Sequence, residues 1–111
     1  MADRDLYNAI IGLNAMAAEA RAFEVAYHLL AAALHAAEDS NDVDAVEEVI
    51  RLAIDQGAAI DAMEDHPMAS NNATRRGTMP LYQTLIMMAR GKLAQIHAHQ
   101  IIDRNRSSTD D

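Results

Sequence analysis

The sequence contains no cysteine. Disulfide frameworks, thiol nucleophiles and thiolate metal sites are therefore excluded. Long apolar runs are also missing, and no stretch approaches the ~20 residues that a membrane-spanning helix requires. The first ten residues, MADRDLYNAI, are charged at positions 3 to 5 and lack the apolar segment of a secretion signal. From these absences we expect a cytoplasmic protein that neither spans nor binds a membrane.

Positive charge is scarce in most of the chain. The formal net charge is −8 over 111 residues. Residues 1–70 hold fourteen acids and three arginines, a net of −11, whereas residues 71–111 hold three acids and six bases, a net of +3. An acidic body repels phosphate backbones, so nucleic acid is not expected as a partner. If the second and third predicted helices bound DNA as a helix-turn-helix, Glu47, Glu48 and Asp55 would face the phosphates, so this function is not expected either.

Half of the residues are hydrophobic, which indicates a folded chain of one domain. Apolar residues recur with a helical period, so we expect an all-α, four-helix antiparallel bundle-like domain over residues 1–105. The helices are predicted at 4–20, 22–38, 42–63 and 79–104. The alternative to the first two is one long helix across 4–38, but the apolar stripe shifts near residues 20–22, which favours a break there. A long loop over 64–78 precedes the last helix, and 106–111 forms a flexible polar tail.

Each predicted helix has an apolar face that is expected to form the core. Leu6, Ile10, Leu13 and Ala17 give this face on the first helix. The second face consists of Phe23, Val25, Ala26, Leu29, Leu30, Ala33, Leu34 and Ala37. The third consists of Val46, Val49, Ile50, Ala53, Gly57 and Ile60, and the fourth of Leu81, Tyr82, Leu85, Ala89, Leu93 and Ile96. Asp42 in the SND run is a predicted helix cap.

Two histidines of the second helix raise the question of a metal site. His28 and His35 lie two turns apart, about 10.5 Å, which is too far for them to share one zinc ion. Both fall on the polar side of the helix, where Glu24 precedes His28 by four residues and Glu38 follows His35 by three. We therefore expect exposed histidines with carboxylate neighbours. No metal or cofactor is predicted, and Glu24 and His28 are the candidates if a metal does bind.

A second candidate is an anion site before the last helix. Arg75, Arg76 and Thr78 precede the predicted helix start at Pro80. Guanidinium groups, a hydroxyl and free backbone N–H groups at a helix N-terminus together suit phosphate or carboxylate. The alternative is that both arginines pair with the acidic body and hold the loop. No motif for a nucleophile or base accompanies the serines, so no catalytic residue is predicted.

The last helix carries a second apolar side, opposite its core face, where a soluble helix normally places charge. This side predicts self-association through the last helix, or contact with another protein. The alternative function is a small-molecule or anion binder, including an enzyme, that uses Arg75 and Arg76. The predicted interface residues are Met87, Gly91, Ala94, Ala98, Ile101 and Ile102.

Overall fold

The computed structural model describes residues 2–63, 66, 68–69 and 80–109, and these residues form four helices without strands. The helices are α1 (Ala2–Glu19), α2 (Phe23–Asp39), α3 (Val43–Asp61) and α5 (Leu81–Thr109). The predicted all-α class is confirmed. The bounds lie near the predicted ones, except that α5 continues past 104 and through part of the segment predicted as a tail. Most of the predicted loop lies outside the described residues.

The same backbone motif closes α1 and α2. After α1, the N–H of Ala22 donates to the carbonyl of Ala17, and the N–H of Arg21 donates to that of Ala18. After α2, Asp42 and Asn41 repeat the pattern with Ala37 and Glu38. This is the Schellman motif, whose penultimate residue takes a left-handed conformation and is usually glycine. Here Arg21 has φ 60° and Asn41 has φ 52°. The predicted break between the first two helices is confirmed.

Asp42 begins α3, as predicted. Its side chain accepts a hydrogen bond from the N–H of Ala45 at 3.1 Å, which satisfies one of the free donors in the first helical turn. The same carboxylate forms an ion pair with Arg4 of α1 at 2.7 Å. One side chain therefore caps α3 and connects it to α1.

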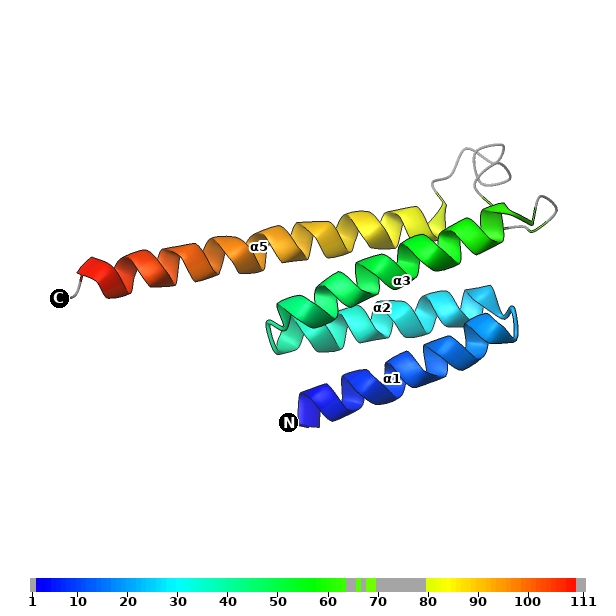
Figure 1. Cartoon of the computed structure of the whole chain (residues 1–111), viewed down its shortest axis with the longest axis horizontal. Helices are drawn as coiled ribbons and strands as arrows, with labels where there is room; N and C mark the ends of the chain where they lie inside the picture. The colour runs from blue at the N-terminus through cyan, green and yellow to red at the C-terminus, as the bar shows by residue number, and fades with distance from the viewer. Residues whose placement is uncertain (1, 64–65, 67, 70–79, 110–111) are drawn as a thin grey trace.

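The helices form a flat, elongated layer in which α1 and α5 are the opposite edges, and α2 and α3 lie between them and partly overlap in this view (Figure 1). Successive helices run antiparallel, and α2 packs against each of the other three as the central element. The extents of 61 × 30 × 16 Å reflect α5, whose 29 residues make it about 43 Å long. α5 therefore projects well past the other helices.

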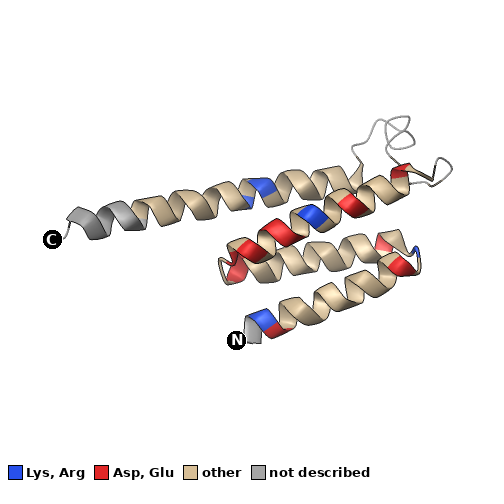
Figure 2. Cartoon of the chain, in the orientation of Figure 1, with Lys and Arg blue, Asp and Glu red and all other residues tan. Residues whose placement is uncertain are grey.

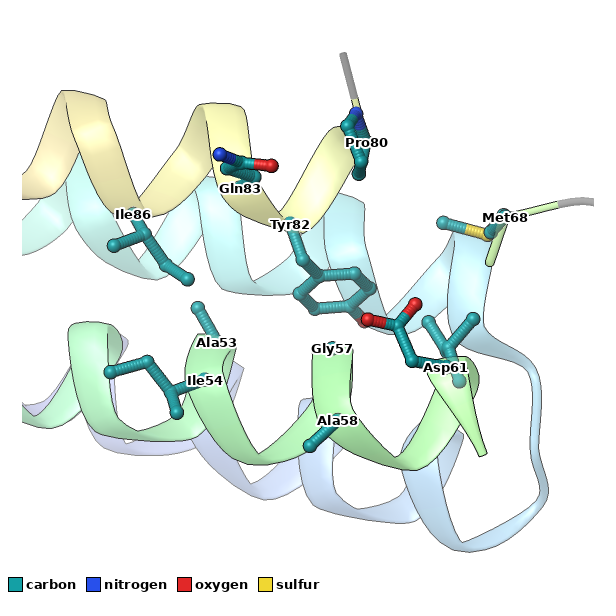
Figure 3. Close-up of a pocket in the computed structure, with 11 residues that line it drawn as sticks. Ala53, Ile54, Gly57, Ala58, Asp61, Met68, Pro80, Tyr82, Gln83 and Ile86 are labelled. Atoms are coloured by element: carbon teal, nitrogen blue, oxygen red, sulfur yellow. The ribbon is translucent and has the colours of Figure 1, made fainter. Parts of the chain in front are cut away.

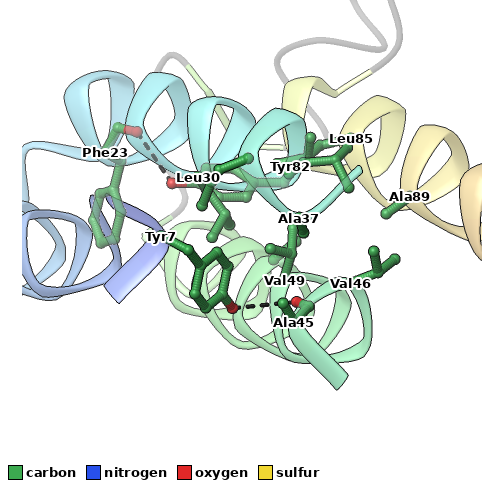
Figure 4. Close-up of a cluster of buried hydrophobic side chains, with 14 of the residues drawn as sticks. Tyr7, Phe23, Leu30, Ala37, Ala45, Val46, Val49, Tyr82, Leu85 and Ala89 are labelled. Atoms are coloured by element: carbon green, nitrogen blue, oxygen red, sulfur yellow. Dashed lines mark hydrogen bonds between the residues drawn. The ribbon is translucent and has the colours of Figure 1, made fainter. Parts of the chain in front are cut away.

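The core lies between the α1–α2 pair and the α3–α5 pair, and all four helices contribute side chains to it (Figure 4). Small residues at Ala33, Ala37 and Ala53 allow the helices to approach closely around the larger side chains. Gly57 has the same effect on α3, where it lies directly against Tyr82 of α5. The larger buried side chains are Tyr7, Phe23, Leu30, Leu34, Val46, Val49, Ile60, Tyr82, Leu85 and Ile96.

The predicted core face of α1 is wrong at two positions. Leu6 and Leu13 are 57% and 50% exposed, whereas Tyr7 and Asn14 are buried. The apolar arc of α1 is wider than its contact with α2 and α3, and the packing selects the line through Tyr7 and Asn14. Val25 of α2 is also exposed rather than buried, because it lies at the edge of an equally wide arc. Leu81, the first residue of α5, is exposed as well, although it was predicted on the core face of the last helix.

Candidate functional site

Three polar side chains from three helices meet in a buried layer. The amide nitrogen of Gln56 in α3 donates to the carbonyl oxygen of Asn14 in α1 at 2.7 Å. The amide nitrogen of Asn14 donates in turn to Gln56 at 3.3 Å and to the backbone carbonyl of Ala26 in α2 at 2.7 Å. The hydroxyl of Tyr82 in α5 lies 2.9 Å from Gln56 Oε1 and 3.1 Å from the carbonyl of Phe23. This polar layer connects all four helices.

Tyr7 makes a second polar connection between α1 and α3. Its hydroxyl donates to the carboxylate of Glu48 and lies 3.2 Å from the carbonyl of Ala45. Burial, together with the hydrogen bond to Glu48 and the charge of that carboxylate, raises the pKa of Tyr7 well above 10. Burial also raises the pKa of Tyr82. Both phenols are therefore neutral donors that hold helices together, and neither is poised for acid–base chemistry near pH 7.

Asn14 and Gln56 were not among the residues predicted for the core or for a site. Asn14 follows Tyr7 by seven residues and so shares its line on α1. Gln56 follows Ala53 by three residues and adjoins Gly57, which places it on the core face of α3. A polar residue on the core face of each of two helices is the sequence signal that would have identified Asn14 and Gln56. Because all of their hydrogen bonds are internal, these residues serve packing rather than ligand binding.

The histidines of α2 are exposed, as predicted. His35 lies 3.6 Å from the carboxylate of Glu38, which confirms the expected neighbour at three residues. The ring of His28 packs edge-on against Tyr27 with centroids 5.2 Å apart, and Glu24 is also exposed. Among the described residues, no group of three or more histidines and carboxylates comes together to hold a metal ion. Glu24 and His28 thus offer at most two ligands.

The predicted anion site cannot be placed. Arg75, Arg76 and Thr78 lie outside the residues that the structure describes, so this site stays a prediction. Pro80 is the first described residue after them, and its carbonyl accepts the N–H of Thr84 as the opening hydrogen bond of α5.

A small groove separates α3 from α5 near the start of α5 (Figure 3). Its volume is about 270 Å³, and its walls are mainly apolar, with Ile54, Met68 and Ile86 among them. Asp61 and Gln83 supply polar groups on opposite sides. Ligand pockets usually hold 300–1,000 Å³ and enclose most of the ligand. The groove is smaller than this range, and Tyr82 packs closely on Gly57 within its lining.

Every predicted interface residue of α5 is exposed. We call these six residues the α5 face. Met87, Gly91, Ala94, Ala98 and Ile101 are spaced alternately four and three residues apart, so they form one line along the helix. Met87 and Ile101 at its ends are 56% and 55% exposed. Ile102 adjoins the line.

The α5 face continues onto the part of α5 that projects beyond the other helices (Figure 1). Ile96 is the last buried residue described on α5, and all described side chains after it, from His97 to Ile102, are exposed. Part of the face is thus reachable from several sides. Contiguous exposed apolar surface of this kind is typical of protein contact sites.

Charge is distributed unevenly over the same helices (Figure 2). The outer side of α3 carries Asp44, Glu47 and Asp55, all exposed. α5 carries Arg90 and Lys92 in its middle. The structure thus separates an acidic region from a basic helix with an apolar face.

Comparisons with protein families, with curated proteins and with solved structures find no match to this chain. No helix within the described ranges combines the length and apolar character needed to cross a membrane.

Proposed function

We propose that this chain is a helical protein–protein interaction module that self-associates through α5. The α5 face supports this function, because it is a continuous exposed apolar line on a helix whose other side already packs against α3. Apolar surface of this length favours burial, at roughly 25 cal/mol for each Å² removed from water. The flexible methionine at position 87 also suits an adaptable contact.

A second copy is the partner that the charges favour. The segment that carries α5 is net positive, at +3, whereas residues 1–70 have a net charge of −11. The positively charged segment with α5 in one molecule is therefore attracted to the acidic residues 1–70 of another molecule. A contact between identical chains also needs no further component, and most soluble oligomers are of this kind.

The solution mass as a function of concentration tests this proposal. Sedimentation equilibrium from 1 to 500 µM should show association of the wild-type chain. Met87→Glu and Ile101→Glu should each weaken it, because a carboxylate would be buried without a partner. Met88→Glu is the matched control, since Met88 is a neighbouring methionine, 47% exposed, that lies about 100° away around the helix. A monomeric wild-type chain at 500 µM would overturn the proposal.

A further inference from the structure

α1 carries a second exposed apolar line, which the core leaves uncovered. It consists of Leu6, Ala9, Leu13 and Met16 together with Ala20 directly after the helix, all exposed and spaced alternately three and four residues apart. We call these five residues the α1 face. Leu13 and Met16 are 50% and 66% exposed. The buried line of Tyr7 and Asn14 lies about 100° or more away around the helix, so the α1 face is additional to the core face.

The α1 face and the α5 face match in length and in shape. One runs from position 6 to position 20, directly after the end of α1, and the other from 87 to 101, so in each case the ends lie fourteen residues apart, about 21 Å at the helical rise. The middle of the α1 face is bulky, with Leu13 and Met16. The middle of the α5 face is small, with Gly91, Ala94 and Ala98. At this spacing, side chains of one helix insert between residues of the facing helix as knobs into holes, and small residues leave room for bluky ones to do so.

Their flanking charges are complementary as well. Asp5 and Glu19 lie along one side of the α1 face, fourteen residues apart on the same line. Arg90 lies along one side of the α5 face. All three side chains are exposed. Opposite charges beside an apolar line set partner choice in paired helices. Two paired α5 faces would offer Arg90 no carboxylate, since residues 81–102 contain no acidic side chain.

We propose that the α1 face of one copy receives the α5 face of a second copy, so that every chain has one donor and one acceptor surface. The inference rests on the proposed self-association and names the surface that α5 meets. The contact forms between chains, because α1 and α5 lie at opposite edges of the layer (Figure 1) and both faces are exposed in the single chain.

Substitutions on α1 test this pairing, because α1 has no role in a contact between two α5 helices. Leu13→Glu and Met16→Glu should each raise the dissociation constant at least ten-fold, as Met87→Glu should. Ala15→Glu is the control on the opposite side of α1, and it should leave association unchanged. Circular dichroism should show retained helix in all variants, since these positions are exposed.

A mixing experiment separates the two proposals. The Leu13→Glu chain keeps an intact α5 face and the Ile101→Glu chain keeps an intact α1 face, so an equimolar mixture should form a 1:1 complex although each variant alone is monomeric. If the α5 variants dissociate while the α1 variants associate normally, or if mixing restores nothing, the α1 pairing is overturned and self-association through α5 stands. A monomeric wild-type chain would overturn both.

Discussion

The side-chain amides of Asn14 and Gln56 form a reciprocal pair across the core, although 42 residues separate them in the chain. Both are buried, at 1% and 8% exposed. A buried amide that loses its hydrogen-bond partner still bears the free-energy cost of its removal from water. The pair therefore holds α1 and α3 in one register, and Tyr82 extends it to α5.

Asn14→Ala should lower the free energy of unfolding by about 2–3 kcal/mol, because Gln56 Nε2 and the Ala26 carbonyl lose a buried partner. Urea unfolding followed by circular dichroism measures the loss. The double variant Asn14→Leu with Gln56→Leu should recover much of it, since both ends of the pair become apolar. A loss below about 0.5 kcal/mol for Asn14→Ala would contradict the role given to the pair.

Stability should fall as the pH rises above about 10. The pKa of Tyr7 and that of Tyr82 are raised in the folded chain, so the unfolded chain loses these protons first and is favoured at alkaline pH. Between the pKa of the unfolded chain and that of the folded chain, each tyrosine lowers the free energy of unfolding by about 1.4 kcal/mol per pH unit. Below pH 10 this stabilisation is fully present.

The pH dependence is measured by urea unfolding between pH 8 and pH 11. Lys92 is the single lysine, so few other groups titrate in this range. Tyr82→Phe should be less stable at pH 8, because the hydrogen bonds to Gln56 and Phe23 are lost, but its slope above pH 10 should be shallower. An unchanged slope in both Tyr7→Phe and Tyr82→Phe would show that these phenols do not control it.

Gly12→Ala and Gly57→Ala should differ although both glycines lie inside helices. Alanine at an open helical position stabilises by about 0.5–1 kcal/mol. A Cβ at Gly12 meets nothing within 4 Å, whereas one at Gly57 would lie 3.3 Å from Tyr82 Cβ. Tyr82 cannot move away freely because its hydroxyl is anchored in the polar layer. Thermal unfolding should show a gain for Gly12→Ala alone, and an equal gain for Gly57→Ala would contradict the close packing.

Arg21→Gly should raise the free energy of unfolding by about 0.5–1 kcal/mol. Arg21 has φ 60°, a conformation that is costly for a residue with a Cβ and open to glycine. Arg21→Ala is the matched control, because it removes the charge and keeps the strain. If both variants gain equally, the strain at this turn is not the cause.

Much of the fold could be predicted from local sequence. The apolar period gives the helices, and Asp42 with its acidic neighbours gives the start of α3. The predicted exposure of His28 and His35 follows from the same period and is confirmed. The turn at Arg21 carries no glycine, but the shift of the apolar stripe across it was sufficient to place the break.

The buried line of α1 depended on tertiary structure. Leu6 and Leu13 are more apolar than Asn14, so local hydrophobicity favours burying them. The structure buries Tyr7 and Asn14 instead, because their polar groups reach Glu48 and Gln56 on α3, 41 and 42 residues away. For the same reason, the sequence predicted one of the two exposed apolar faces better than the other. The α5 face could be predicted because it lies opposite the core face of its helix, whereas the α1 face adjoins the core line and two of its residues, Leu6 and Leu13, were predicted as core.

The sequence by itself determined where the chain is helical, because helix formation depends on neighbours within four residues. Only the tertiary structure decided which side of each wide apolar arc is buried and which is left for a partner. That choice depends on hydrogen bonds and packing between residues about forty positions apart, which no local pattern contains.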